Sequence, residues 1–157
     1  MIKKLEKFQM ALGVIFLSIF FIAILTQIIT RYLGISVIWT EEVANYSFIW
    51  AIFMGAAVMV NRREHFSFDF LTQKLHGKKK AGLLFVIDLI VMIFAFFITI
   101  YGYEAVTTFW NYNWLSLPEL KMGYIWIAIP IMGITMMIYS INHIVGHIKV
   151  MTSKGAV

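Results

Sequence analysis

The chain has 157 residues, of which 61% are hydrophobic and 13% carry a formal charge, against about 25% charged residues in ordinary soluble domains. A soluble domain of this length could not bury so much apolar surface, so the composition excludes a soluble enzyme, a disordered chain and a small disulfide-linked secreted module. The net charge is +5 and there is no cysteine, which also excludes a disulfide, a thiolate metal site and a catalytic thiol.

The first predicted element is a transmembrane helix over residues 9–30. No charged side chain interrupts the run from Phe8 to Thr30, which is long enough to cross about 30 Å of hydrocarbon as a helix. Lysines precede this run, as in a signal peptide. However, the apolar stretch is too long for one, and it ends in ITRYLG rather than in a small-x-small cleavage site. We therefore expect this segment to be retained as a membrane anchor.

Three further apolar runs predict transmembrane helices over residues 42–61, 82–103 and 123–144. The run between Glu42 and Arg62 contains no charged side chain, and the run between Lys80 and Glu104 contains only Asp88. The run between Lys121 and Lys149 contains no Asp, Glu, Lys or Arg, and its histidines are His143 and His147. The sequence therefore predicts an all-α membrane protein with four transmembrane helices in a single integral membrane domain, residues 1–157.

The distribution of cations predicts the orientation. With four spans, both termini and the middle loop lie on one side of the membrane. Most Lys and Arg residues fall on that side, namely Lys3, Lys4, Lys7, Arg62, Arg63, Lys74, Lys78, Lys79, Lys80, Lys149 and Lys154. Because cytoplasmic loops carry an excess of Lys and Arg, we expect both termini to be cytoplasmic. The positive charge then serves topology and contact with lipid headgroups rather than nucleic-acid binding.

The middle loop predicts a short helix lying in the membrane interface. Phe68, Leu71 and Leu75 recur at i, i+3 and i+7, which places them on one helical face. We expect this amphipathic helix to end near Gly77, before the cluster Lys78–Lys80.

Few ionisable residues lie inside the predicted spans, although carriers and pumps place such groups deep in the bilayer. We interpret Asp88 as an interfacial acid that is neutralised by Lys80, Arg62 or a partner protein. His143 and His147 share a helical face at i, i+4, a spacing that can bind metal. We interpret them as solvated interfacial side chains, since a transmembrane haem needs histidines at depth on facing helices.

The second predicted span carries two features that favour contact with a partner. Ser47, Ala51 and Gly55 form a stripe of small residues, which allows a close approach of another helix, either in this chain or in a partner. Glu41 and Glu42 begin the same helix. There they can satisfy free N–H groups and complement the helix dipole, or they can anchor a partner on the outer side.

The segment from Trp39 to Leu71 resembles the signature of the small, DctQ-like Q subunits of tripartite ATP-independent periplasmic (TRAP) transporters. That pattern has an aromatic residue, a pair of acids, a Trp, a Gly-Ala-Ala, a basic residue, a His and an Asp. They are matched by Trp39, Glu41, Glu42, Trp50, Gly55-Ala56-Ala57, Arg62 or Arg63, His65 and Asp69. Arg31-Tyr32 at the end of the first span also fits. Asn45 departs from the family, whose members often carry Arg there.

The resemblance implies a subunit that is not an enzyme and holds no cofactor. In this family a large multi-span M subunit binds sodium and substrate, and a periplasmic P protein delivers an organic acid such as sialic acid or a C4-dicarboxylate. The small subunit acts as a scaffold for M in the bacterial inner membrane. The residues expected to contact partners are Trp39, Glu41, Glu42, Ser47, Trp50, Ala51, Gly55, Arg62, Arg63, His65 and Asp69.

Two alternative functions remain open at this stage. Four spans also suit a small autonomous exporter, but such exporters typically place a Glu in the first span, and the run from Phe8 to Thr30 has none. The membrane anchor of a respiratory enzyme would need histidines at the depth of a haem.

Overall fold

The computed structural model describes residues 2–64 and 74–153. Within these ranges the long helices are α1 (Ile2–Tyr32), α2 (Trp39–Arg62), α4 (Gly77–Phe109) and α6 (Ala128–Thr152), and the short helix α5 (Gly123–Trp126) lies between α4 and α6. With α5 and α6 taken as one segment, four helical segments are long and apolar enough to cross a membrane. The predicted class of an all-α membrane protein with four spanning helices is therefore confirmed.

The helices extend beyond the predicted spans because helical structure does not have to stop at the edge of the apolar run. The first helix begins at Ile2 rather than near residue 9, since the intervening Lys and Glu residues are good helix formers. The third begins at Gly77 and includes Lys78–Lys80. Gly77 is the first residue of this helix. Phe68 and Leu71 of the predicted interfacial helix lie outside the described residues, so that helix stays a prediction.

The last predicted span is divided near its start. A short turn at Ile127 separates α5 from α6, and the Ile127 N–H bonds the Gly123 carbonyl at 3.0 Å. Pro130 follows in the first turn of α6. Because proline has no N–H to donate to the carbonyl four residues earlier, it is tolerated near a helix start but interrupts a continuous ladder.

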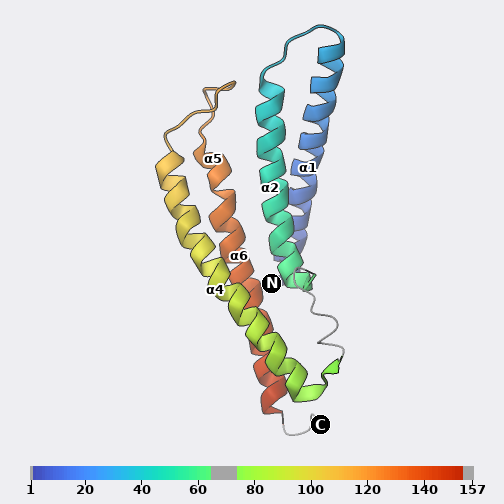
Figure 1. Ribbon diagram of the computed structural model, residues 1–157, viewed down its shortest axis with the longest axis vertical. Coiled ribbons are helices and arrows are strands. Elements are labelled where there is room, and N and C mark those ends of the chain that lie inside the picture. Colours follow the sequence, from blue (N-terminus) through green and yellow to red (C-terminus); the bar gives the residue numbers. More distant parts are fainter. Residues whose placement is uncertain (1, 65–73, 154–157) are drawn as a thin grey trace.

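The helices form two antiparallel pairs, α1 with α2 and α4 with α6, and the pairs meet where α2 packs on α6 (Figure 1). The turn after α1 and the connection from α4 to α5 lie at one end, which we call the loop end. The start of α1 and the end of α6 both point away from the loop end, and we call that side of the molecule the termini end (Figure 1). The buried core where the pairs meet consists of Ala57, Val60, Ala95, Met132, Met136 and Tyr139.

A very close helix approach lies between α4 and α6. A Cβ atom added at Gly133 would lie 2.3 Å from Thr99 Oγ1 and 2.9 Å from the Ala95 carbonyl oxygen. Any side chain at this position would therefore overlap α4, including its backbone. Glycine allows the two helices to touch, as small residues commonly do at membrane helix interfaces.

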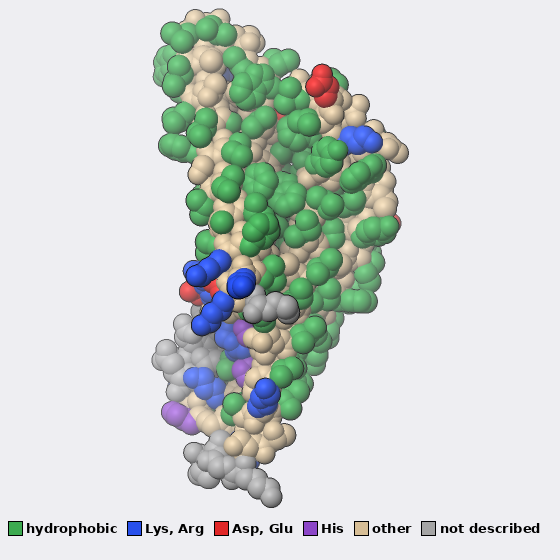
Figure 2. All heavy atoms as spheres, turned by 180° about the vertical axis from the view of Figure 1, so that it is seen from behind, with side chains coloured by type: hydrophobic (Ala, Val, Ile, Leu, Met, Phe, Trp, Pro, Cys, Tyr) green, Lys and Arg blue, Asp and Glu red, His purple; other side chains and the backbone are tan. Residues whose placement is uncertain are grey.

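Large apolar side chains cover much of the outer surface, above all on α1 and α4. Figure 2 shows a wide hydrophobic surface, with Lys, Arg and His side chains gathered toward the termini end. In water such a surface would be unstable, whereas lipid or another membrane protein can cover it. This distribution is that of a multi-pass membrane protein.

Candidate functional site

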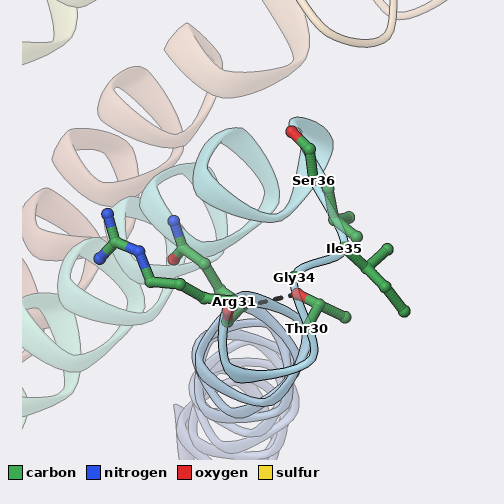
Figure 3. Close-up of a pocket in the computed structure, with 7 residues that line it drawn as sticks. Thr30, Arg31, Gly34, Ile35 and Ser36 are labelled. Carbon is green, nitrogen blue, oxygen red and sulfur yellow. Dashed lines mark hydrogen bonds between the residues drawn. The ribbon is translucent and has the colours of Figure 1, made fainter.

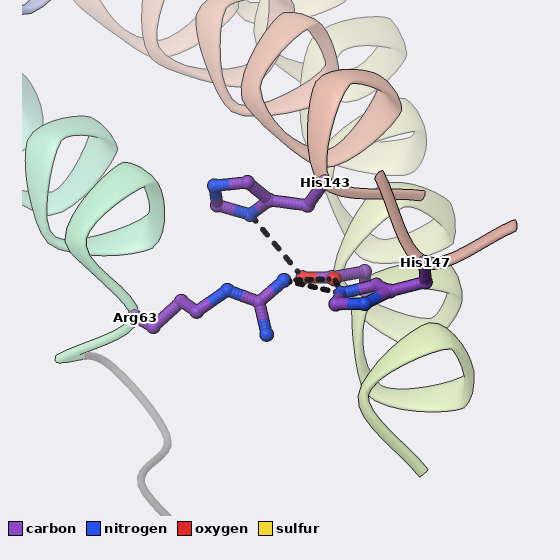
Figure 4. A network of polar contacts seen from close by, with 4 residues as sticks. Arg63, His143 and His147 are labelled. Atoms are coloured by element: carbon purple, nitrogen blue, oxygen red, sulfur yellow. Dashed lines mark hydrogen bonds and ion pairs between the residues drawn. The ribbon is translucent and has the colours of Figure 1, made fainter. Parts of the chain in front are cut away.

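Three side chains, from the end of α2 and from α6, converge on Asp88 of α4 near the termini end (Figure 4). Arg63 Nη2 lies 2.7 Å from Asp88 Oδ2, and His147 Nε2 lies 3.0 Å from the same oxygen. His143 Nδ1 lies 3.5 Å from Asp88 Oδ1. We call these four residues the Asp88 cluster. A charge buried this deeply in a span is stable only with such partners.

The backbone at the end of α2 aims Arg63 at this cluster. Arg63 has a φ of 61°, in the left-handed region, and its N–H bonds the Val60 carbonyl while the Glu64 N–H bonds that of Met59. This arrangement resembles the common way of closing a helix, although glycine is the usual residue there. The turn carries the Arg63 side chain away from α2 and toward α4 and α6.

The structure corrects two predictions about these residues. Asp88 is paired with Arg63 and the two histidines, and not with Lys80 or Arg62. His143 and His147 are not solvated, because each side chain is only 13% exposed and faces Asp88. Arg62 instead pairs with Glu6 of α1 at 2.7 Å, and Asn61 donates to the other Glu6 oxygen at 2.8 Å.

At the loop end, Glu42 holds the connection between α4 and α5 against the start of α2. Its two carboxylate oxygens accept hydrogen bonds from the backbone N–H groups of Leu115 and Ser116, at 2.8 and 2.7 Å. The Ser116 hydroxyl donates to the Ile38 carbonyl at 3.2 Å. The capping interpretation predicted that Glu42 accepts hydrogen bonds from free N–H groups at the start of its own helix. The start of α2 has no side-chain cap. Glu42 satisfies a different segment.

Aromatic side chains next to this contact join α1, α2 and α5. Trp50 donates its ring N–H to the Tyr124 carbonyl at 3.0 Å and stacks on Phe16 of α1 at a centroid separation of 5.2 Å. Tyr46 packs edge-on against Trp114, with centroids 4.5 Å apart. The loop end is thus held by one carboxylate and a group of aromatic rings.

A shallow polar pocket lies beside these contacts, at the turn from α1 to α2 (Figure 3). Gly34 makes this turn with a φ of +71°, and its N–H bonds the Arg31 carbonyl at 3.2 Å. Arg31 and Ser36 extend to opposite sides of the turn (Figure 3). Because these polar groups do not converge on one point, the pocket has no single position for a polar ligand.

Comparison with known proteins decides the family. Residues 20–150 match the family model described as "Tripartite ATP-independent periplasmic transporters, DctQ component". The chain belongs to the DctQ family. This confirms the resemblance predicted from Trp39–Leu71, and it makes the chain a small TRAP permease subunit.

Three relatives of this DctQ subunit carry informative names. The chain is 31% identical over 121 residues, 75% of this chain and 73% of the relative, to a putative TRAP transporter small permease protein of Haemophilus influenzae (strain ATCC 51907 / DSM 11121 / KW20 / Rd). It is 26% identical over 134 residues, 83% of this chain and 76% of the relative, to the sialic acid TRAP transporter small permease protein SiaQ of Vibrio cholerae serotype O1 (strain ATCC 39315 / El Tor Inaba N16961).

The third relative is much longer. It is the sialic acid TRAP transporter permease protein SiaT of Haemophilus influenzae (strain 86-028NP), 32% identical over 131 residues. The match covers 80% of this DctQ subunit but only 20% of the relative. The chain therefore spans about a fifth of the length of that relative.

The residues of the family pattern are spread over both ends of this DctQ subunit. Glu42 and Trp50 belong to the contacts of the loop end, whereas Glu41 is exposed and Trp39 is 41% exposed. At the termini end, Arg63 belongs to the Asp88 cluster and Arg62 pairs with Glu6. His65 and Asp69 lie outside the described residues. Contact of any of these residues with a partner stays a prediction.

The stripe of small residues is used in two different ways. Ser47 is buried, and α1 approaches Ala51, because a Cβ atom at Gly13 would lie 3.8 Å from the Ala51 carbonyl. A Cβ atom at Gly55 would meet nothing within 4 Å. Packing inside the described part of the chain therefore accounts for the first half of the stripe, and Gly55 remains open to the surroundings of the subunit.

A buried polar contact between α1 and α6 was not predicted. Gln9 is 2% exposed, and its amide donates to the Thr135 hydroxyl at 2.9 Å while its carbonyl accepts from the Tyr139 hydroxyl. Hydrogen bonds of this kind join helices inside a membrane. The sequence signal was a Gln at the start of a predominantly apolar run.

The Glu42 contact leads to a prediction about the loop. Changing Glu42 to Gln removes the charge and leaves one acceptor oxygen for two N–H donors, which weakens the hold on the backbone by roughly 1–2 kcal/mol. We expect the amides of Leu115 and Ser116 to exchange hydrogen about tenfold faster, measured by mass spectrometry in detergent. The control is Glu41→Gln, an exposed acid in the same turn, which should leave the exchange unchanged. Equal effects of both changes would contradict the contact.

Proposed function

We propose that this chain is the non-catalytic small subunit of a sodium-coupled TRAP transporter, and that it acts as a scaffold for a large permease subunit in the bacterial inner membrane. The large subunit binds sodium and the substrate. A periplasmic binding protein delivers the substrate, an organic acid. In this proposal the chain itself holds no cofactor or metal.

The observation that carries the proposal is the match to the long relative. A segment related to 80% of this chain makes up 20% of a protein named as a permease. In that relative the segment is covalently joined to a much larger polypeptide. A small subunit that occurs elsewhere as part of a permease chain is best explained as a permanent structural neighbour of the rest of the permease.

The use of the polar groups supports a scaffold rather than a carrier. In residues 2–64 and 74–153, Asp88 is the buried acid of the spans, and it is engaged by Arg63 and two histidines. The amide of Gln9 is likewise engaged by Thr135 and Tyr139. A carrier needs polar groups that exchange partners with an ion or substrate, whereas these groups join the chain's own helices.

The named relatives point to sialic acid as the transported organic acid, since two of the three are named as sialic acid TRAP transporter proteins. We propose sialic acid ahead of a C4-dicarboxylate for this reason. The substrate pocket itself lies in the large subunit in this proposal, so substitutions in the small subunit should change the amount of active transporter rather than the choice of substrate.

Reconstitution tests the proposal. The large permease is placed in liposomes with or without this chain, the binding protein is added outside, and uptake of radiolabelled sialic acid is followed with a sodium gradient. We expect uptake only when the chain and the sodium gradient are both present. A potassium gradient and a C4-dicarboxylate serve as controls. Full uptake by the permease and binding protein alone would overturn the scaffold role.

The proposed orientation gives a separate prediction. The chain has no cysteine, so single cysteines can report which side they face. We expect Leu115→Cys at the loop end, where Leu115 is 90% exposed, to react with a membrane-impermeant maleimide in intact spheroplasts. We expect Ser153→Cys at the termini end to react only after the cells are opened. The reverse pattern would mean that the termini are periplasmic.

A further inference from the structure

A groove lies between α1 and α2 at the termini end, and its two halves differ in chemistry. Apolar side chains form one half, and two cations together with the acid Glu6 border the other. The residues that matter here are Lys7, Met10, Ala11, Val14, Ile15 and Arg62. Along α1 the order runs from the charged residue near the termini end to the apolar residues toward the middle of the helix.

The apolar half is open to the outside of the subunit. Val14 is 55% exposed and Ile15 is 53% exposed, so neither side chain is covered by the described helices. From Lys7 to Ile15 the helix rises about 12 Å at 1.5 Å per residue. That length is close to the roughly 15 Å of hydrocarbon in one leaflet of a bilayer.

The charged half has donors that the described part of the chain leaves available. Glu6 holds Arg62 through Nε at 2.7 Å, and this bond leaves the terminal amino groups of the guanidinium without a partner among residues 2–64 and 74–153. Lys7 is exposed and makes no ion pair within the same ranges. Two cations against one carboxylate leave an excess of positive charge at the mouth of the groove.

We propose that this groove binds one anionic phospholipid of the phosphatidylglycerol class. Its phosphate lies between Lys7 and Arg62, and an acyl chain lies along Met10, Ala11, Val14 and Ile15. The excess positive charge selects an anionic headgroup over a zwitterionic one. Figure 2 shows cations toward the termini end of the surface and a wide hydrophobic area beside them.

Glu6 has a specific part in this arrangement. Its second oxygen accepts from Asn61 at 2.8 Å, so the carboxylate is held by two neighbouring residues of α2 and positions the guanidinium of Arg62. A guanidinium presents fixed, paired donors that match a phosphate. The ion pair between α1 and α2 thus orients a lipid-binding group as well as joining two helices.

Native mass spectrometry of the full chain in detergent tests the site. The protein is mixed with equal amounts of phosphatidylglycerol and phosphatidylcholine, and the ratio of the two bound lipids is measured. We expect Lys7→Gln and Arg62→Gln each to lower the preference for phosphatidylglycerol about fivefold, the usual effect of one cation near a membrane surface. The control is Lys149→Gln, which removes the same charge on α6, and it should keep the preference. An equal loss in the control would overturn the proposal, because net charge would then explain the binding.

Two further measurements distinguish a bound phospholipid from other possible occupants of the groove. Inorganic phosphate in large excess should not displace phosphatidylglycerol, because the acyl chain contributes to binding. Displacement would mean a simple anion site and would overturn the lipid assignment. A photo-crosslinking amino acid in place of Ala11, on the exposed wall of the groove, should capture phospholipid in membranes. Capture of a protein chain instead would overturn the proposal and assign the groove to a partner helix.

Discussion

Replacing Asp88 by Ala should lower the free energy of unfolding of the subunit in detergent by about 3 kcal/mol. Asp88 is 5% exposed and joins Arg63 of α2 with His143 and His147 of α6. The change leaves the Arg63 guanidinium beside two imidazoles without a counter-ion. Removing one partner of a buried ion pair costs more than the pair itself contributes, because the other charge stays desolvated. Unfolding by sodium dodecyl sulfate, followed by circular dichroism, measures the effect.

The control for this prediction is Arg62→Gln, next to Arg63 in the sequence. Arg62 is 45% exposed in its own ion pair, and such a pair contributes less than about 1 kcal/mol. A double-mutant cycle with Asp88→Asn and Arg63→Gln should show a coupling of at least about 1 kcal/mol. Additive effects would mean that the two residues do not act together.

Uptake by an Asp88 variant distinguishes a structural role of the Asp88 cluster from a role in proton transfer. Under conditions in which the Asp88→Asn variant stays folded, we expect the assembled transporter to keep its uptake rate, because the Asp88 contacts in the structure are with this chain's own residues. A folded variant that assembles normally but does not support uptake would contradict the structural interpretation.

Replacing Gly133 by Leu is the second large effect that we expect. A Cβ atom alone would lie 2.3 Å from Thr99 Oγ1 and 2.9 Å from the Ala95 carbonyl, so α4 and α6 must move apart. We expect a loss of about 3 kcal/mol in the free energy of unfolding, measured in the same detergent titration. Size-exclusion chromatography should show less monodisperse protein.

Gly55→Leu is the matched control, because it makes the same chemical change at a position where a Cβ atom meets nothing within 4 Å. We expect the isolated subunit to keep its stability. If a partner helix packs against Gly55, co-purification with the large permease should fall in this variant while the fold is unchanged. Similar destabilisation by both glycine changes would contradict the packing described for α4 and α6.

The four helices were predictable because each charge-free run is long enough to span the hydrocarbon. The ends of the helices were not, since Lys-rich segments such as Lys78–Lys80 continue the helix outside the apolar run. Two pairs of neighbouring residues show why the site could not be predicted in detail. Arg62 and Arg63 are adjacent cations, yet one pairs with α1 and the other with α4. Glu41 and Glu42 are adjacent acids, yet only Glu42 contacts the loop.

The sequence by itself determined the class of the protein, the number of spanning helices and the DctQ resemblance, because hydrophobic run length and an ordered motif are local properties of the chain. Only the tertiary structure decided which polar side chains meet. That depends on the rotation of each helix about its axis and on the left-handed backbone at Arg63, and neither can be read from the spacing of residues. The same reason explains why two glycines of the spanning helices differ in their tolerance of a side chain. Gly133 and Gly55 look alike in the sequence, but only the neighbour that each one faces decides whether a side chain can fit.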